Sequence, residues 1–218
     1  MAGNCQGGTG TASDESRHYA DNELTVFSAA TFANSGFHAQ ESRSKLYLLG
    51  MRYGKRLYGK RLFGVSYTPE LIPMVFFSQP VPQAALTTPG LRPQNMTHSS
   101  FGPAFSPVGF ECSIRSHRLQ PFMGGHAVFI YFGRNEPSAL AAQFNFIGDG
   151  QVGLRIPLKS RKALTMAYRF HHFSNGFMAR DNPGVDSQML FIGFTITNWP
   201  SRIRSHPNRY GSPRISYL

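Results

Sequence analysis

The stretch "AQFNFIGDGQVGLRI", residues 142–156, alternates between apolar and polar side chains along most of its length. Successive side chains of a β-strand point to opposite faces of the sheet, so the alternation divides the segment into two faces. The apolar face holds Ala142, Phe144, Phe146, Gly148, Gly150, Val152, Leu154 and Ile156. The other face includes Gln143, Asn145, Asp149, Gln151 and Arg155. The segment is therefore predicted to be a long strand with one apolar and one polar face.

Similar strand-like segments, separated by turn signals rich in Gly and Pro, recur along the chain. Strands are predicted at 24–33, 45–54, 62–77, 107–116, 121–132, 142–157, 162–174 and 186–197. Short connections at 55–61, 117–120 and 158–161 alternate with longer ones at 34–44, 78–106, 133–141 and 175–185. This layout predicts an all-β fold, an eight-stranded antiparallel up-and-down β-barrel with its longer connections on one rim.

Charges on the polar faces indicate which side of this barrel is the interior. They have both signs and comprise Arg52, Glu70, Glu111, Arg115, Asp149, Arg155 and Arg169. A soluble barrel that carries a ligand puts its apolar face inside and its charges in water. Here aromatic side chains crowd the apolar faces, and opposite charges can pair in a narrow interior. We therefore predict a transmembrane β-barrel, with the soluble carrier as the alternative.

Composition indicates one domain, because 218 residues with 41% hydrophobic residues can form a single sizeable core. There is no window of about twenty apolar residues, which excludes a transmembrane helix on length. We expect an N-terminal tail without an evident signal peptide at 1–22, the barrel at 23–199 and a basic tail at 200–218. Cys5 and Cys112 form no metal motif, and neither is assigned a role.

The formal net charge of +11 could indicate a nucleic-acid-binding protein. The basic residues gather instead in turns and ends, at 52–62, 157–162 and 202–214, and no nucleic-acid-binding motif accompanies them. Such basic turns could face anionic lipid head groups or lipopolysaccharide phosphates, or they could be solvated without any partner. We predict a membrane protein that does not bind nucleic acid.

Candidate catalytic residues lie in "HHFSNGFMARDNPGVD", residues 171–186. By alternation His172 and Ser174 share the apolar face of one strand, and Asp186 lies on the apolar face of the next. Polar groups on an apolar face are costly unless they serve one another or a ligand. A histidine that accepts the serine proton, held in its tautomer by a carboxylate, is what attack on an ester requires. An ordinary polar loop with a turn aspartate is the alternative.

The tetrahedral intermediate of such a reaction needs hydrogen-bond donors for its oxyanion. The connecting loop can supply them from Asn175, Gly176 and Asn182.

The hairpin "YRFHHFSNGFMARDNPGVD" resembles the H-x-S-N hairpin of the PagL family of lipid A deacylases, which are eight-stranded outer-membrane barrels. The segments "LYLLGMRYGKRL", "SPVGFECSIR", "LQPFMGGHAVFIYF" and "QFNFIGDGQVGLRIP" are similar to other strands of the family. The resemblance implies that His172 is the base, Ser174 the nucleophile and Asp186 the acid, where characterised members have glutamate. The family's oxyanion asparagine would match Asn182, with a loop backbone N–H as second donor.

Together the pattern and the resemblance predict an outer-membrane serine esterase that removes an ester-linked acyl chain from lipid A or a related glycolipid. No metal or other cofactor is expected, because no carboxylate cluster with ligand spacing accompanies His172 and Ser174. The alternative is a catalytically silent barrel with a structural or lipid-binding role, which would tolerate loss of Ser174. In contrast to barrels that end in an aromatic residue, Trp199 is followed here by a basic tail.

Overall fold

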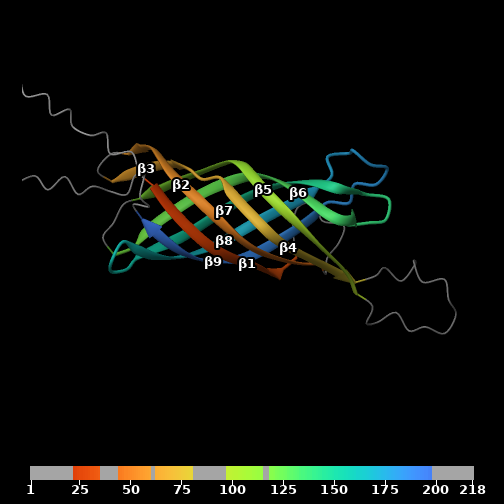
Figure 1. Ribbon diagram of the computed structural model, residues 1–218, viewed down its shortest axis with the longest axis horizontal. Coiled ribbons are helices and arrows are strands. Elements are labelled where there is room, and N and C mark those ends of the chain that lie inside the picture. Colours follow the sequence, from red (N-terminus) through yellow and green to blue (C-terminus); the bar gives the residue numbers. More distant parts are fainter. Residues whose placement is uncertain (1–21, 35–43, 60–61, 81–96, 115–117, 198–218) are drawn as a thin grey trace, which may run out of the picture.

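The computed structural model describes residues 22–34, 44–59, 62–80, 97–114 and 118–197. These residues form one antiparallel sheet of nine strands that closes into a ring (Figure 1). The strands are β1 (Asn22–Ala33), β2 (Lys45–Gly59), β3 (Phe63–Tyr67), β4 (Glu70–Pro80), β5 (Thr97–Ile114), β6 (Gln120–Glu136), β7 (Ala142–Pro157), β8 (Lys162–Ser174) and β9 (Val185–Thr197). The ring closes because β1 pairs with both β2 and β9. No helix in the described ranges is long and apolar enough to span a membrane.

The up-and-down order of the barrel is confirmed, but the described residues contain nine strands rather than the eight predicted. The predicted strand 62–77 breaks at Thr68–Pro69, since proline has no N–H to give to the ladder. Both halves, β3 and β4, pair with β2 on one side and β5 on the other. They therefore lie end to end between β2 and β5 in the sheet.

The predicted connection 78–106 is too long, because β5 already begins at Thr97. In the structure Pro73 and Pro103 lie where the β4–β5 register shifts, and Pro107 lies at a shift between β5 and β6. A strand tolerates proline at such irregularities. Residues 97–106, which include Pro103, are thus part of the wall.

The assignment of the two faces is confirmed on most strands. It is wrong for Val75 and Phe77, which alternation places on the apolar outer face of the predicted strand 62–77, because the register shift at Pro73 turns both side chains inward. On β7 the outward side chains Phe144, Phe146, Val152 and Leu154 are 36–52% exposed. The charged side chains predicted for the interior are 0–7% exposed at Arg52, Glu70, Glu111, Arg155 and Arg169. Arg115 lies outside the described residues. An apolar outer wall around a charged interior is the arrangement of a membrane barrel, so the soluble carrier is excluded. The predicted tails lie outside the described residues, except that Asn22 begins β1.

The interior has two zones. Three phenylalanine rings, those of Phe77, Phe132 and Phe173, pack together with centroids 5.3–5.9 Å apart. The second zone is a network of buried ion pairs. In it Arg52 and Arg169 each lie 2.6 Å from Glu70 Oε1, and Arg155 lies 2.9 Å from Glu111. Such charges are stable in a dry interior only when they are paired, so the network locks five strands to one another.

Candidate active site

The segment His172–Phe173–Ser174 ends β8 and alternates between the two sides of the wall. Phe173 points inward and is buried between Phe77 and Phe132, with ring centroids 5.3 and 5.9 Å away. Because neighbouring side chains in a strand point to opposite sides, His172 and Ser174 face outward. The packed ring of Phe173 therefore fixes the part of the backbone that presents both polar groups.

Asp186 lies directly opposite His172 in the β8–β9 ladder. The two side chains form a hydrogen bond of 2.5 Å between His172 Nδ1 and Asp186 Oδ1. The Asp186 side chain is 1% exposed, whereas that of His172 is 38% exposed. When the carboxylate accepts the hydrogen bond from Nδ1–H, Nε2 of the neutral imidazole is left as an acceptor. This is the tautomer that a general base requires.

Ser174 lies opposite Phe146 of β7 and is half-buried. Within the described ranges its hydroxyl makes no hydrogen bond, so it shares a face with His172 without being bonded to it. Hydrogen bonds of this kind are often long or absent without substrate. Of the three predicted catalytic residues, His172 and Asp186 are thus hydrogen-bonded to each other. Ser174 lies on the same outward face as His172, but the two side chains are not hydrogen-bonded.

The loop after Ser174 is organised by Asn175, whose side chain is fully buried. Its backbone N–H donates to Asn182 Oδ1 at 2.8 Å, and its Nδ2 donates to the Asp181 carbonyl at 2.6 Å. The Asn175 N–H and the Asn182 side-chain oxygen are therefore engaged with each other. In the described part of the chain, Gly176 N–H and Asn182 Nδ2 make no hydrogen bond, so these are donors that a ligand could use.

A second connection supports this loop, and no sequence pattern indicates it. Asp181 N donates to the Leu140 carbonyl at 3.2 Å, and Ser138 Oγ donates to Asp181 Oδ2 at 2.5 Å. Figure 1 shows the β6–β7 and β8–β9 connections at the same end of the barrel, next to one another. Asp181 thus fastens the loop after the candidate nucleophile to the neighbouring connection.

A strip of small residues on the outer wall adjoins His172. Gly148 pairs with His172 and Gly150 with Phe170, and their partners on β6 are Ala127 and Gly125. A Cβ added at Gly148 or at Gly150 would meet nothing within 4 Å. Further along the same seam lies an open apolar depression of about 510 Å³ whose lining includes Val152, Leu154, Met166, Tyr168 and Leu190. The β7–β8 seam therefore has open space at the two glycines beside His172 and a depression nearer its middle.

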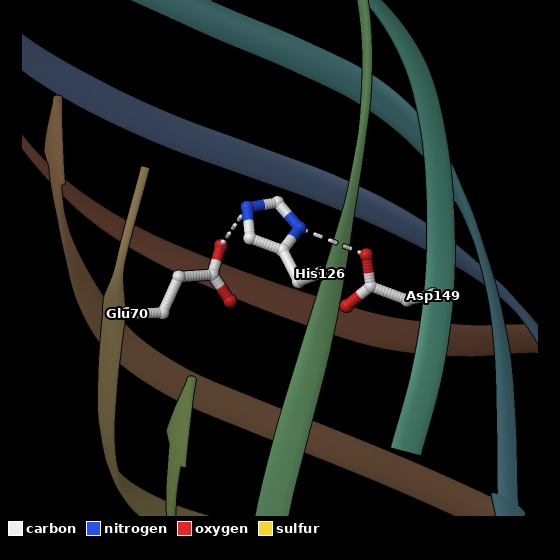
Figure 2. A group of neighbouring side chains, drawn as sticks. All are labelled: Glu70, His126 and Asp149. Atoms are coloured by element: carbon white, nitrogen blue, oxygen red, sulfur yellow. Dashed lines mark hydrogen bonds and ion pairs between the residues drawn. The ribbon is translucent and has the colours of Figure 1, made fainter. Parts of the chain in front are cut away.

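Glu70, His126 and Asp149 form an interior cluster that the sequence pattern does not mark as a unit. Figure 2 shows the His126 ring between the two carboxylates. Its Nδ1 lies 2.9 Å from Asp149 Oδ1, and its Nε2 lies 3.5 Å from Glu70 Oε1. Their potential ligand atoms lie within 4.8 Å of one another, as in a metal site. However, the guanidinium groups of Arg52 and Arg169 already contact Glu70. We interpret the cluster as part of the ion-pair network.

His171 points into the barrel, as alternation predicts, and is 1% exposed. Its Nδ1 lies 3.9 Å from Asp149 Oδ2. His171 is therefore on the opposite side of the wall from Ser174.

A closed barrel with an apolar outer wall, bearing a histidine–carboxylate pair beside a serine near one rim, belongs to the class of membrane-barrel hydrolases. The model of the lipid A 3-O-deacylase (PagL) family matches residues 76–195. The chain belongs to this family. It is therefore a carboxylic ester hydrolase of the bacterial outer membrane that acts on lipid A.

Solved structures of outer-membrane barrels are similar to the chain. The crystal structure of the outer membrane enzyme PagL is 15% identical, and the match covers 79% of this chain and 99% of that one with a TM-score of 0.57. Neisserial surface protein A is 11% identical over 82% of this chain and 97% of its own, with a TM-score of 0.48. No curated protein is significantly similar to the chain in sequence.

Proposed function

We propose that the protein cleaves the 3-O-linked acyl chain of lipid A by a serine esterase mechanism, with Ser174 as nucleophile, His172 as base and Asp186 as the acid that orients it. The 3-O position is the one for which the family is named. The observation that carries the proposal is the 2.5 Å His172–Asp186 hydrogen bond on the outward face that also bears Ser174.

In the first step Ser174 Oγ attacks the ester carbonyl carbon while His172 Nε2 takes the hydroxyl proton. The intermediate expels the sugar alkoxide, which leaves as an alcohol with the proton held by His172. Water then attacks the acyl-serine with His172 again as base, which releases the fatty acid and restores Ser174. Asp186 accepts the Nδ1–H hydrogen bond throughout and stabilises the transient imidazolium.

Gly176 N–H and the Nδ2 group of Asn182 are the proposed oxyanion donors, because both are available in the described loop. Asn175 is assigned a positioning role, since its N–H and Nδ2 already bond to Asn182 and Asp181. Donors fixed in advance cost little reorganisation when the charge develops, which is the basis of oxyanion stabilisation.

The outward orientation of the site fits a substrate that never leaves the bilayer. The sugar would lie at the rim, and the scissile acyl chain would lie along the strip of Gly148 and Gly150. Two glycines leave room for a hydrocarbon chain against the strand backbone, and the apolar depression beyond them continues the path. Because the acyl chain is already surrounded by lipid tails, its packing against the wall, and not removal from water, would decide how well it binds.

Mass spectrometry of lipid A tests this proposal. Cells that express the protein should contain lipid A lacking one ester-linked acyl chain, and cells that express Ser174→Ala should not. A silent barrel would leave lipid A unchanged in both, and loss of an acyl chain from another position would contradict the 3-O assignment.

A further inference from the structure

Phe177 is the most exposed of the large apolar side chains in the described residues, at 87%. It also has a backbone conformation that bulky residues avoid, with φ 63°. Gly176 before it has φ 62°, and Met178 N donates to the Asn175 carbonyl at 3.2 Å. Two successive left-handed residues closed by this bond form a type I′ turn, whose central positions favour Gly and Asn. A phenylalanine is therefore held in a strained position without the compensation of burial.

The turn lies on the lipid side of the wall. A Cβ at Gly176 would be 3.2 Å from ring atoms of Phe146, which is the outward residue opposite Ser174. Phe146 in turn packs against Phe144 and Phe129, with centroids 5.3 and 5.7 Å away. Phe177 thus lies three residues after Ser174, in a turn whose Gly176 adjoins an outward aromatic cluster. Local strain that persists at such a place points to a use for the side chain.

We propose that the Phe177 ring packs on the acyl chain of the bound glycolipid and makes the enzyme selective for esters of long acyl chains. This inference rests on the proposed function of Ser174. Hydrocarbon is the occupant that fits, because the ring is apolar and the aromatic cluster beside the turn faces lipid. Contact with an acyl chain would also give the ring a packing partner that the described residues do not give it.

Steady-state kinetics of the full chain in detergent tests the proposal with two substrates, lipid A and p-nitrophenyl butyrate. Phe177→Gly removes the ring and relieves the backbone, so the barrel should unfold at a temperature no lower than that of the parent. We expect KM for lipid A to rise about tenfold, in line with loss of partial burial of a ring. Hydrolysis of the butyrate should be unchanged, and Phe177→Leu should restore most of the lipid A activity.

Phe101→Ala, which removes an exposed ring from the outward face of β5, is the matched control and should leave both substrates unaffected. Equal kinetics of Phe177→Gly and parent on lipid A would overturn the inference. An equal loss of activity on both esters would also overturn it, because Phe177 would then support the structure of the loop and not contact the acyl chain. A parent that hydrolyses neither ester contradicts the proposed function instead.

A readout independent of catalysis is quenching of Phe177→Trp fluorescence by brominated acyl chains, measured against the parent, whose only tryptophan is Trp199. Strong quenching is expected in vesicles. No quenching beyond that of the parent would place the ring in water and contradict the inference.

Discussion

At the scale of single residues, the side of the wall on which a histidine lies decides its role. Ser174→Ala and His172→Ala should each abolish deacylation, because nucleophile and base act as a unit, and the double variant should lose little more. His171→Ala should be much milder, since its ring faces the interior beside Asp149. The measurement is lipid A profiling by mass spectrometry for each folded variant.

Heat-modifiable migration in SDS gels should show that each of these variants is folded. If Ser174→Ala released fatty acid at the parent rate, the serine mechanism would be wrong.

Asp186→Asn gives a graded test at the same scale. The side chain keeps its shape but no longer carries the charge that stabilises the imidazolium, so activity should fall while exceeding that of His172→Ala. The rate of lipid A deacylation by the two purified variants checks this order. A loss as complete as that of Ser174→Ala would mean that the acid does more than orient the ring and stabilise the imidazolium.

At the scale of elements, the seam between β7 and β8 is expected to hold the acyl chain. Gly150→Leu places a branched side chain in the open space beside Phe170, and the barrel should tolerate it because nothing lies within 4 Å of the new Cβ. Long-chain deacylation should fall about tenfold or more, while hydrolysis of p-nitrophenyl butyrate should persist. Ser28→Leu, on the exposed face of β1, is the control and should be without effect. Equal activity of both variants on lipid A would mean that the acyl chain does not bind in the β7–β8 seam.

At the scale of the whole molecule, the interior ion pairs should determine stability. Arg169→Met removes the guanidinium that contacts Glu70 and Asp149, and breaking a buried pair in this way costs about 3–5 kcal/mol. The temperature at which the barrel unfolds in SDS should therefore fall well below that of the parent. Arg180→Met, at an exposed loop position, should leave it unchanged. A similar fall in both variants would show that charge in general, and not the network, is responsible.

Chelation is a second test at this scale. The proposed chemistry uses only Ser174, His172 and Asp186, so EDTA should leave activity intact. Activity that was lost with EDTA and restored by calcium would indicate a different hydrolytic mechanism.

Alternation alone predicts most of the wall, because a period of two is fixed by strand geometry and does not depend on tertiary context. From residue order by itself, it puts Arg169 inside the barrel and puts His172 and Ser174 outside. It fails where local signals are ambiguous. Pro103 falls in the predicted connection 78–106, yet a register shift accommodates it within β5.

The site was predictable in part for a related reason. His172 and Asp186 are opposite one another because the β8–β9 register pairs them, and the hairpin length sets that register. Contacts between different connections, such as Ser138 with Asp181, leave no periodic trace in the sequence. The open strip at Gly148 and Gly150 had a signal in the sequence, namely two glycines on one outward face. Only the structure shows that no neighbouring side chain fills the space beside them.

The pairing of β1 with β9 joins Glu23 to Thr197, two residues near opposite ends of the described part of the chain. Until this last ladder forms, both strands present unpaired backbone edges, which hydrocarbon does not tolerate. The ion-pair network is also incomplete before closure, because its arginines and acids come from β2, β4, β5, β7 and β8. The barrel therefore has no stable half-inserted form, and closure of the seam must accompany entry into the bilayer. Assembly of this enzyme is in that sense a single cooperative event, in which the β1–β9 seam closes as the barrel enters the bilayer.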